Sequence, residues 1–342
     1  MTKAELNCLF FPDLLSWERS SVAPIIDELS KTHTINQIEV ERSHRGLLKK
    51  AATDTSYWIL SADWKDSLRF LGVKGKRPNL RASVFGLPAQ NGSLATLMWR
   101  RLRPELPFIQ LVTHSPINFR FYRELIGLAD RQVEFLPLPF SPQLQQEYSG
   151  LRRPKKTPLT VGTFAPFTSE SNLNYFVNVA HYIRRNRPDT RFRILGSGML
   201  YPHLARMIQQ MNLEDCVTVV ESVTHEHVAD LDVLLYVPLR NDHFIPLLVG
   251  AAAGIPVLCS EITGIEEFIQ DGKNGFIVPC NETKPMGELA IRLLDHEFLR
   301  LSIARELKSY LGSKFSVESL APNYESLLFG KSSPQAQLVR AA

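Results

Sequence analysis

Short apolar runs alternate with longer stretches of mixed polarity along most of the chain. Apolar runs of this length predict buried strands, and apolar residues spaced three or four positions apart predict helices between them. In the N-terminal part, strands are predicted at residues 8–11, 35–40, 57–61, 83–87, 108–113 and 133–138, and helices at 14–29 and 117–128. Strands that alternate with helices favour a parallel sheet with crossover helices, as in a Rossmann-like domain.

The same alternation recurs in the C-terminal part of the chain. Strands are predicted at residues 159–162, 191–195, 217–220, 233–237 and 255–259, and helices at 172–187, 200–211, 247–253, 286–311 and 316–328. Residues 225–230 are predicted to be a short connector. We therefore predict an α/β protein with two Rossmann-like domains.

A cluster of prolines and basic residues at 139–157 is the clearest change of composition along the chain. Closely spaced prolines cannot continue a helix or a central strand. We therefore predict a linker at 139–157 between an N-terminal domain (1–138) and a C-terminal domain (158–330), followed by a flexible tail (331–342). A ligand cleft is expected between the two domains.

The stretch 232–275 is the most informative part of the sequence. A buried strand is followed by the polar turn 240–243 and by a helix that has Pro246 near its start and Gly254 at its end. This turn lies at the carboxyl end of a strand and at a helix N-terminus, where open α/β sheets bind phosphorylated ligands. Phe244, Ile245 and Leu247, at the start of this helix, are therefore expected to offer backbone N–H groups to a diphosphate.

A particular spacing of residues, mostly small residues, prolines and glycines, is found in and after this stretch, at Pro246, Ala251, Ala253, Gly254, Pro256, Val257, Gly264, Glu267, Gly272, Asn274 and Gly275. This spacing resembles that of the retaining glycosyltransferase family 4, which has the GT-B fold. The resemblance covers roughly residues 158–330. It implies two Rossmann-like domains that face each other across a cleft, with a last helix that packs back on the N-terminal domain. It also implies transfer of a sugar, as in hexosyltransferases, from a nucleotide-sugar to a glycan or lipid-linked acceptor, with no metal and no other cofactor.

The residues that carry the family's chemistry differ in this chain. Asn241 and Val249 occupy the positions of the family's two glutamates. Thr163 occupies the position of an arginine that holds the diphosphate, and Thr168 or Ser169 that of a lysine. Two hypotheses therefore stay open: a glycosyltransferase, or a catalytically degenerate GT-B protein that binds a glycan or a partner.

Candidate site residues follow from the same comparison. The catalytic candidates are Asn241 and its neighbours Asp242 and His243, together with His114, which follows a strand in the N-terminal domain. The candidates for binding the donor are Gly162, Thr163, Thr168, Glu221, Arg240, Phe244, Ile245 and Leu247. Asp242 and His243 could instead cap the helix, and His114 could be a satisfied buried histidine. The Gly-x-Gly at 196–198 fits either a ligand or close packing.

The distribution of charge along the chain indicates which kinds of partner it could bind. The chain carries a net charge of +4, and residues 65–103 hold nine basic residues against one acid, Asp66. An amphipathic helix around Trp99 in this segment would suit an anionic membrane surface, although a core helix with a solvated edge fits equally. No nucleic-acid motif is present. No apolar run reaches the roughly 20 residues of a membrane span, so we expect a cytoplasmic protein, with possible peripheral contact to the inner membrane face.

Overall fold

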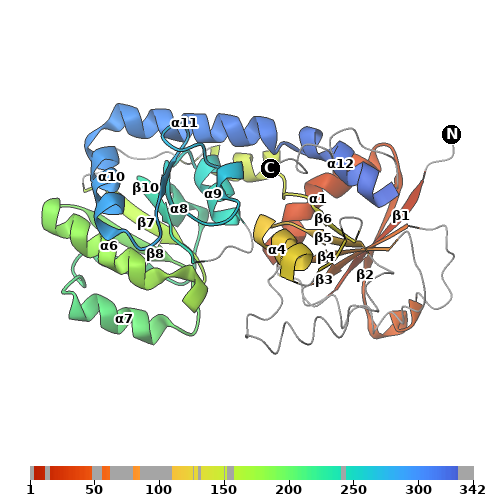
Figure 1. Ribbon diagram of the computed structural model, residues 1–342, viewed down its shortest axis with the longest axis horizontal. Coiled ribbons are helices and arrows are strands. Elements are labelled where there is room, and N and C mark those ends of the chain that lie inside the picture. The colour runs from red at the N-terminus through yellow and green to blue at the C-terminus, as the bar shows by residue number, and fades with distance from the viewer. Residues whose placement is uncertain are drawn as a thin grey trace. The chain divides into compact units, whose positions relative to one another are not determined.

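The chain forms two compact units, which are shown in Figure 1. Unit 1 falls within residues 1–141 and 315–342, and unit 2 within residues 142–314. The computed structural model describes residues 4–11, 16–47, 56–61, 80–84, 110–125, 127–129, 132–149, 151, 158–239 and 244–329. Among these residues, no helix combines the length and the apolar character that crossing a membrane requires.

Unit 1 is built on a sheet in which all paired strands are parallel. Its strands are β1 (Glu5–Phe10), β2 (Thr34–Glu39), β3 (Ser56–Ser61), β4 (Leu80–Val84), β5 (Gln110–Thr113) and β6 (Val133–Phe135). The strand order is β2-β1-β3-β4-β5-β6, which confirms the predicted parallel arrangement. The fourth strand begins three residues earlier than the sequence predicted, so that Leu80 and Ala82 both enter the buried core.

Three α-helices of unit 1 are described, in addition to a 3₁₀ turn at Arg42–His44. They are α1 (Ser16–Ser30), α4 (Pro116–Arg120), which continues into a π-helical turn at Phe121–Leu125, and α12 (Val317–Phe329). The last helix, α12, packs beside α1 (Figure 1). Arg81 of β4 is buried and donates from Nε to the carbonyl oxygen of Leu327 at 3.0 Å. Arg81 was counted in the basic segment 65–103, but its guanidinium therefore joins β4 to α12 and does not contribute to a basic surface.

Unit 2 contains a second parallel sheet. Its strands are β7 (Thr160–Phe164), β8 (Arg191–Leu195), β9 (Val217–Val220), β10 (Val233–Tyr236), β11 (Val257–Ser260) and β12 (Phe276–Val278). They lie in the order β12-β11-β10-β7-β8-β9. The predicted boundaries of β8 and β9 are confirmed residue for residue.

The helices of unit 2 are α5 (Pro142–Ser149), α6 (Leu173–Asn186), α7 (Tyr201–Gln210), α8 (His225–Ala229), α9 (Ile245–Ala252), α10 (Thr283–Asp295) and α11 (Glu297–Lys314). Helix α5 lies within the segment predicted as a linker. It begins at Pro142, and a proline is compatible with the first turn of a helix, where its missing N–H would have no partner. The predicted connector 225–230 is instead the short helix α8, and the Thr224 N–H at its start donates to His227 Nδ1 at 3.1 Å.

Gly254 ends α9, as the sequence predicted. Its φ of 63° lies in the left-handed region, and its N–H donates to the carbonyl of Ala251 at 3.0 Å. The next N–H, that of Ile255, reaches back to the carbonyl of Gly250 at 2.8 Å. These two bonds form a Schellman motif, which satisfies the last helical carbonyls and directs the chain into β11.

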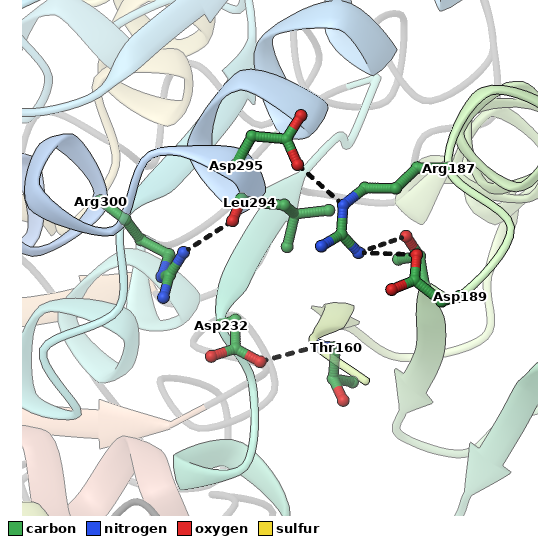
Figure 2. Close-up of polar contacts among 8 residues, drawn as sticks. Thr160, Arg187, Asp189, Asp232, Leu294, Asp295 and Arg300 are labelled. Atoms are coloured by element: carbon green, nitrogen blue, oxygen red, sulfur yellow. Dashed lines mark hydrogen bonds and ion pairs between the residues drawn. The ribbon is translucent and has the colours of Figure 1, made fainter. Parts of the chain in front are cut away.

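Polar contacts tie together the ends of elements in unit 2, as Figure 2 shows. The Asp232 carboxylate accepts from the Thr160 N–H at 2.8 Å, which joins the beginnings of β10 and β7. Arg187, which follows α6, donates from Nε to Asp295 at the end of α10 at 3.0 Å. The buried Arg300 donates to the carbonyls of Leu293 and Leu294 at 3.0 and 3.1 Å and so satisfies the last turn of α10.

The Asp-Gly-x-Asn-Gly sequence at 271–275 forms a tight turn before β12. Asn274 is buried, and its Oδ1 accepts from the Gln270 N–H at 2.7 Å. Asp271 Oδ1 accepts from the Ile277 N–H at 2.9 Å. These contacts give the turn its shape, so the part of the family resemblance that lies here reflects folding and not ligand contact.

Candidate functional site

The strand order of unit 2 changes direction between β7 and β10. From β7 the chain proceeds outward to β8 and β9, whereas from β10 it proceeds to β11 and β12 on the other side. Loops therefore diverge at the carboxyl ends of β7 and β10, and open α/β sheets bind ligands at such a point. The two loops are joined by the Leu239 N–H, which donates to the Glu170 carbonyl at 2.8 Å.

Close packing with the loop after β8 shapes the loop after β7. Gly196 has a φ of 144°, and a Cβ built on it would lie 2.0 Å from the Ala165 carbonyl oxygen. The Phe167 N–H donates to the Ser197 carbonyl at 2.8 Å. Of the two explanations left open for the Gly-x-Gly sequence, the structure supports packing of one loop on the other.

A pocket of about 370 Å³ opens beside these loops, and we call it the α6–α7 pocket. Its walls come from the loop after β7, the first turn of α6, the start of α7 and the loop after β10. It is lined by Thr168, Ser169, Asn172, Leu173, Asn174, Leu200, His203, Leu204 and Leu239. Figure 1 shows α6 and α7 side by side. Among the described residues, Thr168 is the one predicted donor-binding residue in this lining.

Two other predicted donor-binding residues lie within β7 and not on the loop that follows it. The sequence predicted that this strand ends at Gly162, but it continues to Phe164. Thr163 is only 2% exposed, and a Cβ at Gly162 would lie 2.5 Å from the Leu231 side chain. Both residues therefore belong to the core of unit 2, and the prediction that the strand ends at Gly162 and that Thr163 follows it is wrong.

The start of α9 offers fewer backbone donors than the sequence predicted. The Phe244 carbonyl accepts from the N–H groups of Leu247 at 3.0 Å and Leu248 at 3.2 Å. Pro246 has no N–H, so of the predicted donors at this helix start the N–H groups of Phe244 and Ile245 stay predictions, and that of Leu247 is already used. The ring of Phe244 is buried and stacks on Phe268 with a centroid distance of 4.0 Å, so this turn is held by apolar packing.

Glu221 lies directly after β9, at the same edge of the sheet, and its side chain is exposed. Its predicted contact with the donor stays a prediction. Arg240, Asn241, Asp242 and His243 lie outside the described residues, so their predicted roles also stay predictions. In the described ranges, no group of three or more His, Cys, Asp or Glu side chains is placed to hold a metal ion.

His114 lies in unit 1, immediately after β5, where it is 2% exposed. Its Nδ1 bonds the Leu136 carbonyl oxygen at 2.8 Å and therefore carries a proton. Its Nε2 then accepts from the Ser83 hydroxyl at 3.1 Å. Burial lowers the pKa of His114 to about 4, so the ring is neutral at pH 7 and both of its nitrogens are engaged by protein groups.

The same network extends to two large aromatic side chains. Trp58 Nε1 donates to the Ser83 hydroxyl oxygen at 2.8 Å. The Tyr324 hydroxyl of α12 donates to the Pro137 carbonyl at 3.1 Å and lies 3.4 Å from His114 Nδ1. The network therefore connects the carboxyl ends of β3, β4, β5 and β6 with the last helix, and the structure supports the open alternative of a satisfied buried histidine.

Several residues of the α6–α7 pocket were not among the sequence-based candidates. Asn172, Asn174 and His203 lie near helix starts, in sequence contexts with no chemical motif. A hint was available in Asn172, because asparagine is one of the few residues that adopt a positive φ readily, and its φ is 53°. That two helix starts meet in one pocket follows only from the tertiary structure.

Comparison with known proteins gives the class to which this architecture belongs. Residues 155–296 match the family described as glycosyl transferases group 1. The solved structure of Anabaena Alr3699/HepE in complex with UDP and glucose aligns with a TM-score of 0.70 at 12% identity, covering 96% of this chain and all of that one (100%). The fold is therefore GT-B, and residues 155–296 of unit 2 are similar to group 1 glycosyl transferases.

Curated relatives match mainly over part of the chain. The alpha-D-kanosaminyltransferase of Streptomyces kanamyceticus is 28% identical over 165 residues, which is 47% of this chain and 42% of the relative. A putative colanic acid biosynthesis glycosyltransferase of Salmonella typhimurium is 28% identical over 186 residues, 50% of this chain and 45% of the relative. The chain thus spans less than half the length of these relatives.

Proposed function

We propose that this protein is a glycosyltransferase that moves a sugar from a nucleotide-sugar to a glycan or lipid-linked acceptor. The observation that carries the proposal is the carboxyl edge of the unit 2 sheet, where loops diverge between β7 and β10 within the segment that matches the group 1 family. Relatives named as transferases of sugars support the same activity. The solved complex of Alr3699/HepE with UDP and glucose supports a nucleotide-sugar donor.

The donor would bind without the family's arginine and lysine. Thr168 offers a hydroxyl and the start of α9 offers the Ile245 N–H, while Glu221 occupies the position proposed for the base. Asn241, Asp242 and His243 would add polar groups from the turn before α9. Hydroxyls and amides bring no formal charge, so we expect donor binding to be weaker than in a site with two cations.

The proposed reaction does not need a side chain that acts as general acid or base. In the retaining mechanism that the resemblance implies, the departing diphosphate itself accepts the proton of the acceptor hydroxyl. The protein's part is to hold the donor, orient the acceptor and stabilise the charge that develops. Substitution of the two family glutamates by Asn241 and Val249 is compatible with this mechanism, which uses no metal.

Calorimetric titration with a panel of nucleotides and nucleotide-sugars tests the proposal, in buffers with and without a chelator. We expect at least one nucleotide diphosphate and its sugar to bind and the sugar to be transferred. Absence of nucleotide binding and of turnover across the panel would favour the second hypothesis, a catalytically degenerate protein that binds a glycan or a partner.

Replacement of Asp242 or His243 by alanine is expected to lower turnover tenfold or more, about 1.4 kcal/mol in barrier, with little change in thermal stability. The reason is that a sugar hydroxyl needs a polar partner where the family glutamates are missing. Initial rates and thermal melts should be measured together, with Glu214→Ala as a control at an exposed acid of unit 2. If the two residues act only as caps, stability falls by about 1 kcal/mol and turnover per folded molecule is unchanged.

Peripheral contact with an anionic membrane is a further part of the proposal, based on the charge of residues 65–103. With Arg81 buried, eight of the nine basic residues in this segment lie outside the described ranges. We expect co-sedimentation with vesicles that contain phosphatidylserine at low salt and its loss as salt screens the attraction. Equal sedimentation with neutral vesicles, or none at low salt, would contradict it.

A further inference from the structure

The α6–α7 pocket has a lining that suits a different ligand from a diphosphate. We propose that it binds a neutral saccharide at a site that adjoins the site of the nucleotide-sugar, and Thr168 is the one described donor candidate that lines both. The choice of a sugar as the ligand class rests on the proposed function, whereas the pocket and its chemistry do not. At about 370 Å³ it lies within the size range of small-molecule sites.

Polar groups in the lining are uncharged and versatile. Hydroxyls come from Thr168 and Ser169, amides from Asn172 and Asn174, and an imidazole from His203. Each of these groups can donate or accept a hydrogen bond, as a sugar hydroxyl can. Among the described residues, the lining contains no Asp, Glu, Lys or Arg, and these residues match a ligand rich in hydroxyls and without formal charge.

An apolar surface adjoins these polar groups. Leu200 and Leu239 of the lining are 39% and 47% exposed, and Met199 and Tyr201 next to Leu200 are 95% and 40% exposed. Large apolar side chains that are exposed next to one another often mark a binding surface. Sugar rings have apolar C–H faces beside their hydroxyls, and this pairing of apolar and polar groups matches that character.

Hydrogen bonds and ring contacts hold the walls of the pocket in place. The Leu239 N–H bonds the Glu170 carbonyl, and the Asn172 side-chain N–H donates to Asn281 Oδ1 at 3.1 Å. Tyr201 stacks on the buried Phe167 with a centroid distance of 6.4 Å. A pocket whose walls are already fixed loses less entropy when it binds a ligand.

A phosphate group is the competing occupant, because the first turns of α6 and α7 line the pocket and helix starts attract anions. Among the described residues, no cationic side chain lines the pocket, which favours the saccharide. Of the nucleotide candidates, Thr168 lines the pocket, whereas Glu221 and Ile245 lie outside the described lining. The test must therefore separate three ligands: a neutral sugar, inorganic phosphate and UDP.

The test uses the full chain and four neutral disaccharides: maltose, cellobiose, lactose and chitobiose. Binding is detected by saturation-transfer NMR and quantified by titration, alone and with saturating UDP. The pocket variant is Asn174→Ala combined with His203→Ala, two exposed positions whose truncation leaves the core intact. The matched control is Gln209→Ala combined with Gln210→Ala, two exposed positions at the other end of α7.

We expect at least one disaccharide to bind the wild type and the control equally, and the pocket variant at least tenfold more weakly. Saturating UDP should not displace it, and the pocket variant should bind UDP as the wild type does. No disaccharide binding, equal binding by the pocket variant, displacement by UDP, or binding of inorganic phosphate in place of the sugars would each overturn the proposal. Failure of the proposed function would appear separately, as absence of nucleotide binding and turnover.

Discussion

Acidification from pH 7 to pH 4 is expected to destabilise unit 1 by up to about 3 kcal/mol through His114 alone. The pKa of the buried ring is lowered to about 4, whereas a histidine in the unfolded chain titrates near 6.5. Between these two values the unfolded state binds the proton and the folded state does not. The free energy of unfolding therefore rises with pH in this window. The stability that depends on a neutral His114 is fully present above pH 6.5 and is lost as the pH falls to 4.

Urea titrations at several pH values from 4 to 7 measure this dependence. All four tryptophans lie before residue 142, so tryptophan fluorescence follows unit 1. His114→Gln retains hydrogen-bonding groups but has no proton to bind, so its free energy of unfolding should fall less with acid. The control, His44→Gln, replaces a partly exposed histidine of unit 1 and should keep the wild-type dependence. An unchanged pH dependence in His114→Gln would show that the network does not hold a neutral ring.

Replacement of Gly196 by alanine is expected to cost about 3 kcal/mol or more of the stability of unit 2. The new Cβ would meet the Ala165 carbonyl at 2.0 Å, and this backbone atom can move only if the loop after β7 moves. The φ of 144° adds strain for any residue with a side chain. Strain and overpacking each contribute roughly 1–3 kcal/mol.

Gly272→Ala separates these two effects. Its φ of 72° is also positive, but no atom lies within 4 Å of the added Cβ, so only the strain of about 1 kcal/mol remains. Hydrogen exchange of β7 and β8, followed by mass spectrometry, measures the stability of unit 2 in both variants. Similar losses in the two variants would mean that the loops after β7 and β8 can separate at little cost.

Residues that carry the family resemblance in the sequence turn out to have largely structural roles. Gly254 ends α9, Asn274 and Asp271 shape the turn before β12, and Glu267 pairs with Lys314 of α11 at 2.7 Å. Each acts through neighbours close in sequence or through one helix contact. The fold could be predicted from such residues even though the positions that carry the family's chemistry have changed.

Strand β12 and helices α5 and α8 were not predicted from the sequence. Local pattern alone was sufficient for the parallel sheets, the helix end at Gly254 and the bounds of β8 and β9. These features depend on residues a few positions apart, and apolar periodicity and turn chemistry report such short-range preferences. The extension of β7 beyond Gly162 was missed, because Thr163 and Phe164 follow a glycine and look like the start of a loop.

The tertiary structure alone decided the surroundings of the candidate site residues. The partners of His114, namely Ser83, Leu136 and Tyr324, come from segments up to 210 positions away in the chain, and its burial depends on all of them. The α6–α7 pocket likewise requires Leu239 beside Thr168 and His203 beside Asn174. Burial, a lowered pKa and a pocket arise only when groups distant in sequence come together in the folded chain. A strand or a helix cap depends on residues that are neighbours in sequence.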